Sequence, residues 1–194
     1  SWLLPETTIK AYPVCGHTMT TIEACLDLIR SLASDNPAGP LVSDRVERIE
    51  IRAHSISIGV AGIRSPGTLA EARFSIPFCA ALALAKGRVA LSDFTEDLVR
   101  DPAILSLLEK IVLKKDDSLS DQPGLRPARV SLELKKGPRL SRTALFRRGD
   151  PENPMTREEL ADKFNGLASP VWGNERSESV FRAVYRLPDY DDFN

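Results

Sequence analysis

The sequence predicts an α+β fold, a two-layer sandwich in which a mostly antiparallel sheet is covered by helices on one face. Amphipathic patterns with helical spacing lie at 20–33 and 69–86, and alternating patterns typical of half-buried strands lie at 46–54 and 128–134. Helices and strands are segregated along the chain rather than strictly alternating, which favours α+β over a parallel α/β sheet. A hydrophobic content of 42% and a charged content of 27% are typical of a globular protein.

The first predicted helix follows the stretch Lys10–Thr18, which holds a cation, an X-Pro turn, a thiol, a glycine and an imidazole. Thr20-x-x-Glu23 has the spacing of a capping box. Apolar residues then recur on one helical face, at Ile22, Cys25, Leu26, Ile29, Leu32 and Ala33. Such a turn at a helix N-terminus is suited to holding an anion, although an ordinary capping loop has the same spacing. The segment 36–40, rich in Pro and Gly, ends the helix.

Residues 46–54 alternate as a strand, and the apolar parity then changes, which predicts a bulge or a strand end near His54. Thr68-x-x-Glu71 caps the next helix, and Gly87 is its predicted C′ residue. Pro77 within that helix predicts either a kink or a break, with a new helix starting at the proline.

The later elements are a short helical turn at 92–99, a helix from Asp101 to Leu108, a strand at 111–113 and a hairpin through residues 128–146. The segment 149–154 is a rigid link, and Thr156-x-x-Glu159 caps a further helix, followed by a last one. We therefore expect residues 1–150 to form an α+β domain and residues 151–194 a helical segment. Because the chain begins at Ser-Trp rather than Met, we expect a fragment or a processed product.

Composition and residue spacing argue against a metal site, a membrane-spanning protein and a nucleic-acid-binding protein. The three cysteines have no C-x-x-C pair and read as reduced thiols, and the two histidines are far apart, so we predict no metal site. No signal peptide or membrane helix is seen, which predicts a cytoplasmic protein, or a mitochondrial matrix protein in a eukaryote. Residues 126–148 carry eight basic residues and one acid, a net charge of +7. With Phe146 as its only aromatic residue, this hairpin is not expected to bind nucleic acid.

Three motifs resemble the C-terminal part of the MmgE/PrpD family. They are Lys10-x-Tyr12-Pro13-x-Cys15-Gly16-His17-Thr18, the run Glu71-Ala72-Arg73-Phe74-Ser75-Ile76-Pro77-Phe78, and Arg148-Gly149-Asp150-Pro151-Glu152-Asn153-Pro154, with Glu159-Leu160 and Lys163-Phe164 beyond. Together they cover roughly residues 8–168. The resemblance implies a small α+β lid domain with C-terminal helices that dock on a large helical domain absent from this chain.

The family includes 2-methylcitrate dehydratase, cis-aconitate decarboxylase and iminodisuccinate epimerase, so the resemblance implies a lyase or isomerase acting on a citrate-like polycarboxylate. Its active site would lie between the two domains and need no cofactor and no metal. Such reactions require a cation and hydrogen-bond donors for the carboxylates, and an acid or base that moves a proton. The motifs match catalytic positions at Lys10, Cys15 and His17, and substrate-binding positions at Tyr12, Arg73, Ser75 and Phe78.

Two departures from the family pattern bear on the reaction. Decarboxylase-like members carry a histidine at the position of Cys15, and many members carry a tyrosine at that of Phe78, whose ring has no hydroxyl to donate. Dehydration of 2-methylcitrate or another alkylcitrate is therefore the leading expectation, with the isolated chain inactive. The alternative is a stand-alone lid-like domain, or a pseudoenzyme, that binds a protein. Family members often form homodimers.

Overall fold

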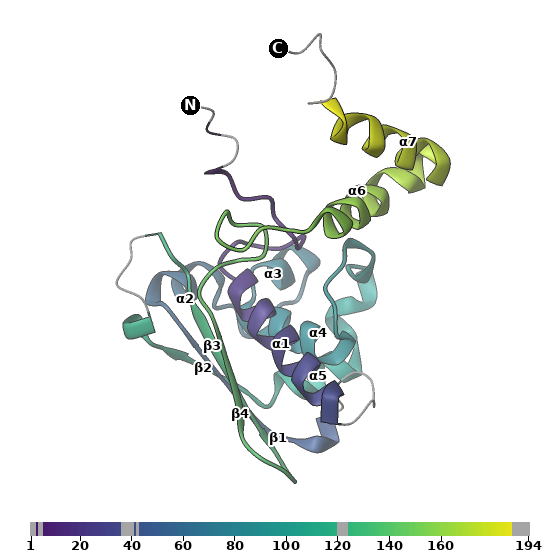
Figure 1. Cartoon of the computed structure of the whole chain (residues 1–194). Coiled ribbons are helices and arrows are strands. Elements are labelled where there is room, and N and C mark those ends of the chain that lie inside the picture. Colours follow the sequence, from purple (N-terminus) through teal and green to yellow (C-terminus); the bar gives the residue numbers. More distant parts are fainter. Residues whose placement is uncertain (1–2, 4–5, 36–40, 42, 120–123, 188–194) are drawn as a thin grey trace. The chain divides into compact units, whose positions relative to one another are not determined.

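The computed structural model describes residues 3, 6–35, 41, 43–119 and 124–187 (Figure 1). The chain divides into two compact units, Ser1–Asn153 and Pro154–Asn194. The boundary falls close to the predicted one, and the roles assigned to the two parts remain predictions. The predicted breaker at 36–40 lies outside the described residues.

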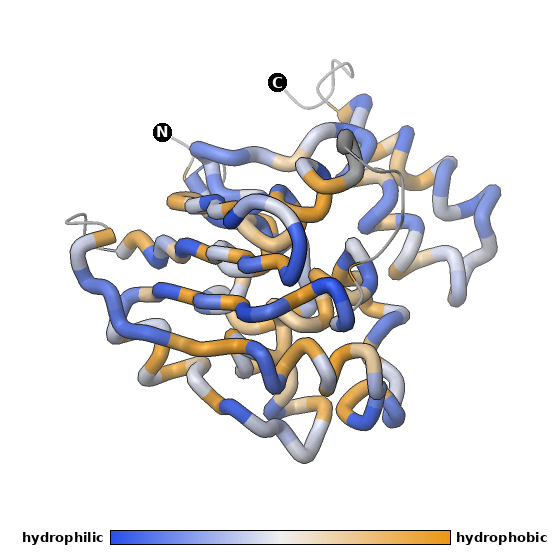
Figure 2. The backbone as a smooth tube through the Cα atoms, turned by 90° about the horizontal axis from the view of Figure 1, so that it is seen from below, coloured by the Kyte–Doolittle hydropathy of each residue, from blue (hydrophilic) through white to orange (hydrophobic). Residues whose placement is uncertain are grey.

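The first unit is built on a sheet with the strand order β2-β1-β3-β4. The strands are β1 (Val46–Ala53), β2 (Ile111–Lys115), β3 (Ala128–Leu134) and β4 (Leu140–Ala144). β1 pairs antiparallel with β3 and β3 with β4, whereas β2 lies parallel to β1. Figure 2 shows hydrophilic and hydrophobic residues alternating along these strands. This mostly antiparallel sheet confirms the predicted α+β class.

Helices cover one face of the sheet: α1 (Met19–Asp35) packs on β3 and β4, and α4 (Ile76–Lys86) packs on α1 and β2 (Figure 1). On the predicted apolar face of α1, Ile22 and Cys25 have no exposed surface and Leu26 is buried, whereas Ile29 and Leu32 are partly buried. Met19 and Leu28, which the pattern did not include, are also fully buried. Burying a large apolar side chain contributes roughly 1.5–3 kcal/mol, so this seam contributes several kcal/mol to the stability of the unit.

The predicted capping box at the start of α1 is wrong. The hydroxyl of Thr20 donates instead to the carbonyl oxygen of Arg126, at 2.6 Å. The carboxylate of Glu23 accepts a hydrogen bond from the Tyr12 hydroxyl. Both side chains bond to partners outside the helix, and the helix begins at Met19, two residues earlier than the motif indicates.

Strand β1 ends at Ala53, which confirms the strand end predicted near His54. The residues that follow form a helix, α2 (Ser55–Ala61), and His54 caps it through Nδ1, which accepts from the amide of Ile56 at 3.2 Å. The change of apolar parity therefore marks a switch from strand to helix.

The second helical pattern is two helices, α3 (Leu69–Arg73) and α4, separated at Phe74 and Ser75. Thr68 forms the predicted capping box with Glu71, and Gly87 takes the left-handed C-cap conformation with φ of 64°. Pro77 lies in the first turn of α4, where its missing N–H costs nothing. Of the two predicted alternatives, the break is therefore confirmed.

Short elements complete the unit. They are the 3₁₀ turns η2 (Ser43–Arg45), η3 (Leu91–Asp93), η4 (Glu96–Arg100) and η5 (Asp117–Leu119), and the helix α5 (Pro102–Leu108). The carboxylate of Asp101 caps α5 by accepting from the amide of Ala103 at 2.9 Å, as expected for an Asp-Pro helix start.

The second unit is a helical hairpin of α6 (Arg157–Trp172) and α7 (Asn174–Tyr185). Thr156 and Glu159 form the predicted capping box. The ring centroids of Phe164 on α6 and Phe181 on α7 lie 5.8 Å apart, so an aromatic contact joins the two helices. Within α6, Phe164 also lies 6.3 Å from Trp172.

Candidate functional site

The three motif segments, far apart in the sequence, meet around the loop that precedes α1. The amide of Cys15 donates to the carbonyl oxygen of Arg73 at 2.9 Å, which joins the first motif to the second. The amide of Ile9, the residue just before the first motif, donates to the carbonyl oxygen of Gly149 at 2.9 Å, which holds the start of the first motif to the third. The N-terminal motif is therefore the meeting point of all three.

Asp150 fastens this junction. It is 6% exposed and accepts hydrogen bonds from the hydroxyl of Thr8 at 2.6 Å and from the amide of Arg147 at 2.8 Å. The guanidinium of Arg147 also pairs with both carboxylate oxygens. Burial alone would raise the pKa of Asp150, but the hydrogen bonds from Arg147 and Thr8 outweigh it and lower the pKa. The carboxylate therefore stays charged in the folded protein.

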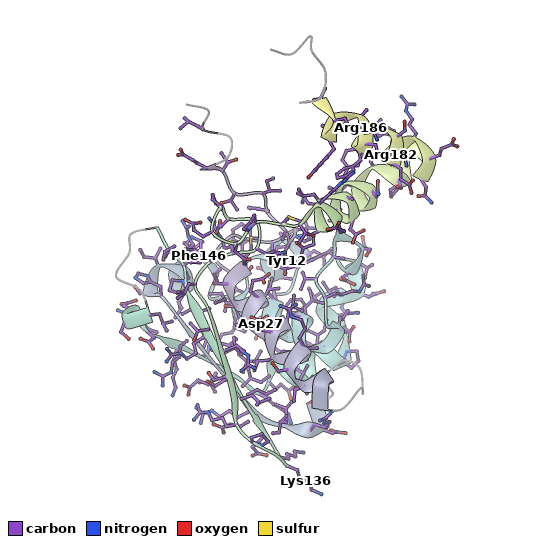
Figure 3. All side chains as sticks on the ribbon, viewed as in Figure 1. Tyr12, Asp27, Lys136, Phe146, Arg182 and Arg186 are labelled. Carbon is purple, nitrogen blue, oxygen red and sulfur yellow. The ribbon has the colours of Figure 1, made fainter. Side chains whose placement is uncertain are left out.

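Lys10 lies on the surface of the loop, and its Nζ is 3.5 Å from the carbonyl oxygen of Val14. Among the described residues it forms no ion pair. Tyr12 is half-buried and lies beside the start of α1 (Figure 3), where its hydroxyl donates to Glu23. Burial raises the pKa of Glu23, and the hydrogen bond from Tyr12 opposes that shift. Lys10 is thus the solvent-facing cation of the motif.

Cys15 and His17 lie on either side of Gly16, where a Cβ atom would stand 3.2 Å from Nη1 of Arg147. The carbonyl oxygen of Cys15 accepts from the amide and the hydroxyl of Thr18, at 3.0 and 2.8 Å. His17 contacts two side chains: Nδ1 is 3.1 Å from Oγ of Ser57, and Nε2 is 3.1 Å from Nε of Arg126.

The electrostatics around His17 favour a neutral ring. Burial lowers the pKa of His17, and the charges of Arg126 and Arg147 lower it further. An arginine N–H can only donate, so Nε2 of His17 accepts and its proton sits on Nδ1, which donates to Ser57. The imidazole is a potential base whose lone pair is already engaged.

Arg73, Ser75 and Phe78 lie at the break between α3 and α4. Ser75 is fully buried and caps α4: its hydroxyl accepts from the amide of Phe78 at 3.0 Å and donates to the carbonyl oxygen of Ile63. Phe78 is also fully enclosed in the core. The guanidinium of Arg73 lies 4.9 Å from the ring centroid of Phe94, a cation–π contact. In this structure Ser75 and Phe78 serve packing and capping, and their contact with a substrate remains a prediction.

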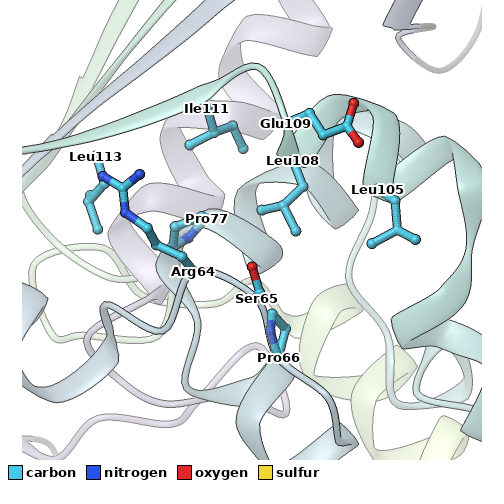
Figure 4. Close-up of a pocket in the computed structure, with 9 residues that line it drawn as sticks. All are labelled: Arg64, Ser65, Pro66, Pro77, Leu105, Leu108, Glu109, Ile111 and Leu113. Carbon is cyan, nitrogen blue, oxygen red and sulfur yellow. The ribbon is translucent and has the colours of Figure 1, made fainter.

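Two pockets differ in their relation to the motifs. One, of about 210 Å³, lies next to the junction and is lined by Glu6, Thr8, Gly124, Leu125, Arg126, Leu145, Arg147, Asp150, Pro151 and Glu152. The other, of about 370 Å³, lies between α5, β2 and the start of α4 (Figure 4). Leucines and Ile111 line it, with Arg64 and Glu109. None of the seven predicted site residues is among the described lining of either pocket, but the first pocket contains Arg126, whose Nε contacts His17. The first pocket is therefore the one that adjoins the candidate site.

Three other features of the described residues concern metal binding, thiol reactivity and membrane insertion. No group of three or more His, Cys, Asp or Glu side chains there is placed to hold a metal ion. Burial raises the pKa of the Cys79 thiol to about 12, so that thiol is inert as a nucleophile. None of the helices described is both long and apolar enough to cross a membrane.

Sequence reasoning missed the side chains that surround His17. Ser57 had no motif, and Arg126 was noted only as one charge of the basic hairpin. Glu23 was assigned to a cap, although it is the acceptor of the Tyr12 hydroxyl. Pairings between residues far apart in the chain, such as His17 with Ser57 40 residues later, leave no local pattern in a single sequence.

These features define an α+β domain that presents a cation-bearing loop at the start of its first helix. The model of the MmgE/PrpD C-terminal domain matches residues 12–187. The chain therefore belongs to the MmgE/PrpD family, as the three motifs predicted.

Relatives with assigned activities include two kinds of enzyme. The chain is 24% identical to human cis-aconitate decarboxylase over 194 residues, which is 99% of this chain and 40% of the relative. It is 26% identical to 2-methylcitrate dehydratase of Salmonella typhimurium over 111 residues, 57% of this chain and 22% of the relative. The 2-methylcitrate dehydratase of Escherichia coli strain K12 is equally similar. The chain thus spans at most about two fifths of these relatives.

Proposed function

We propose that this chain is the lid domain of a cofactor-independent lyase or isomerase that acts on a citrate-like polycarboxylate. Dehydration of 2-methylcitrate or a related alkylcitrate is the leading reaction. The observation that carries the proposal is the meeting of the three family motifs at one loop, through the Cys15–Arg73 and Ile9–Gly149 hydrogen bonds. The loop that makes these bonds carries Lys10 and His17, and His17 contacts Arg126.

The proposed chemistry follows from these side chains. Lys10, exposed and without an ion pair in the described chain, is free to bind a substrate carboxylate or donate a proton. His17 is neutral and can accept one. The second wall of the site would come from a helical domain, on the same polypeptide or on a separate chain, so this chain alone should be inactive.

The test is turnover of 2-methylcitrate and longer alkylcitrates by the polypeptide that carries both domains, with Lys10→Ala as the decisive variant. Loss of a general acid or a carboxylate clamp should lower kcat/KM by about 100-fold or more. Because Lys10 is exposed, its removal should leave the fold intact. Lys136→Ala, at the far tip of the β3–β4 hairpin (Figure 3), is the matched control. Unchanged turnover in Lys10→Ala removes Lys10 from the mechanism.

A protein-binding module is the second candidate, and the exposed apolar side chains of the second unit suit it. Val171, Trp172, Val184 and Tyr185 are 46–78% exposed on α6 and α7, an unusual concentration of large apolar side chains. In the enzyme these would dock on the helical domain, and in a stand-alone module on another protein. The upstream coding sequence separates the two: a contiguous helical domain favours the enzyme, and a start codon just before Ser1 favours the module or a two-chain enzyme.

A further inference from the structure

Arg126 is held against the start of α1 at two points. Its carbonyl oxygen accepts from the hydroxyl of Thr20 at 2.6 Å, and its Nε donates to Nε2 of His17 at 3.1 Å. Its Nη1 also donates to the carbonyl oxygen of Gly124 at 3.1 Å. These contacts fix both the backbone and the guanidinium of Arg126 relative to the loop that carries the first motif.

The charge of Arg126 is uncompensated, unlike that of its neighbour. Arg147 pairs with Asp150 at 2.7 Å, whereas Arg126 forms no ion pair within the described part of the chain. Arg126 also lines the pocket of about 210 Å³, with the exposed Glu6 and Glu152 among the other lining residues. The backbone of Arg126 is therefore held in place, while its guanidinium lines a pocket and has no anionic partner among the described residues.

We propose that Arg126 is a positioning residue for His17: it holds the imidazole as the Nδ1-protonated tautomer and masks the Nε2 lone pair until a carboxylate binds the guanidinium. The guanidinium–imidazole bond has one charged partner, whereas a guanidinium–carboxylate pair has two and can be bidentate, so a carboxylate that engages Nε of Arg126 displaces the imidazole. Binding neutralises the cation and frees Nε2 to accept a proton. That this carboxylate belongs to the substrate rests on the proposed function. The masking of Nε2 by Arg126 does not depend on that function.

The charged groups that face His17 are Arg126 and Arg147, with Asp150 paired to the latter. Asp150 already offsets Arg147, so neutralising Arg126 removes the principal unbalanced charge beside the ring. The change at Arg126 should therefore be visible as a change in the titration of His17.

The test is nitrogen-detected NMR of the two histidines in the 194-residue chain, with His54→Asn used to assign the signals. We expect His17 as the Nδ1–H tautomer, titrating below its ordinary pKa. In Arg126→Gln the pKa should rise and the tautomers should mix. In Arg126→Lys the pKa should stay low, because the charge is kept, while the tautomer preference weakens. Arg129→Gln, an exposed arginine on β3, is the matched control and should change neither.

Citrate is the probe for release, with sulfate at equal ionic strength as its control. In the wild-type chain citrate should raise the pKa of His17, and Arg126→Gln should weaken its binding at least about tenfold, the loss expected for one charged hydrogen bond. A His17 found as the Nε2–H tautomer, or a titration that Arg126→Gln leaves unchanged, overturns the masking. A pKa of His17 indifferent to citrate overturns the release. Failure of the proposed function is a separate result, absence of polycarboxylate turnover by the two-domain polypeptide.

Discussion

Gly149 is the position where the third motif can be tested most sharply. It has φ of 93°, a conformation that side chains rarely adopt, and a Cβ atom there would stand 1.8 Å from the carbonyl oxygen of Ile9. The unfavourable dihedral costs about 1–3 kcal/mol. Because the clash is with backbone, no rotamer relieves it, and the Ile9–Gly149 hydrogen bond, worth about 1 kcal/mol, must break as well. Gly149→Ala should therefore destabilise the first unit by about 2–4 kcal/mol.

The control is Gly124→Ala, because Gly124 has nearly the same φ, 86°, and no atom within 4 Å of a Cβ. It should show the dihedral cost alone. Urea unfolding followed by far-UV circular dichroism gives the two free energies, and hydrogen exchange of the Ile9 amide reports the broken bond directly. Equal destabilisation by the two variants, or an Ile9 amide still protected in Gly149→Ala, would refute the proposed packing of the first motif on the third.

Three further predictions concern stability. Asp150→Asn should lower the free energy of unfolding at pH 7; because the folded pKa of Asp150 is depressed, the difference from wild type should shrink as the pH falls below about 3.9, measured by urea unfolding across pH. Ion pairs with Lys114 and Arg52 hold the pKa of Glu50 at about 2, so the stability lost in Glu50→Gln should likewise disappear between about pH 4.3 and 2. Ser75→Ala should cost about 1–2 kcal/mol in thermal or urea unfolding, because it removes the cap of α4. A Ser75→Ala chain as stable as wild type would contradict the capping role.

Much of the fold was predictable because its signals are local. The alternation at 46–54 and 128–134 gave β1 and β3, and the capping boxes at Thr68 and Thr156 marked two helix starts. The parallel pairing of β2 with β1 was not predictable, because Ile49 and Ile111 are joined by a long connection of several helices and no local pattern specifies which strands pair. Helix α2 was hidden for a different reason: residues 55–61 are too short to show a clear helical period.

The capping box wrongly predicted at Thr20 shows the limit of predicting structure from local sequence. Thr20 and Glu23 have the same spacing as Thr68 and Glu71, and the two pairs differ only in their surroundings. Glu71 is exposed and satisfies the backbone of its own helix, whereas Glu23 is 9% exposed and meets the hydroxyl of Tyr12. A buried carboxylate takes the strongest donor that the fold brings to it, and a single sequence does not reveal that donor.

The family motifs contain two kinds of residue that the sequence alone does not separate. Gly149 bonds to Ile9, and Asp150 bonds to Thr8 and Arg147, so both residues hold the chain in place. Ser75 and Phe78 are fully buried at the start of α4. Lys10 remains exposed, directly after Ile9, whose amide holds the loop to Gly149. A substitution at Gly149 should therefore displace Lys10 without contacting it. Loss of activity in a motif variant can be assigned to the chemical step only if the Ile9 amide in that variant is still protected from hydrogen exchange.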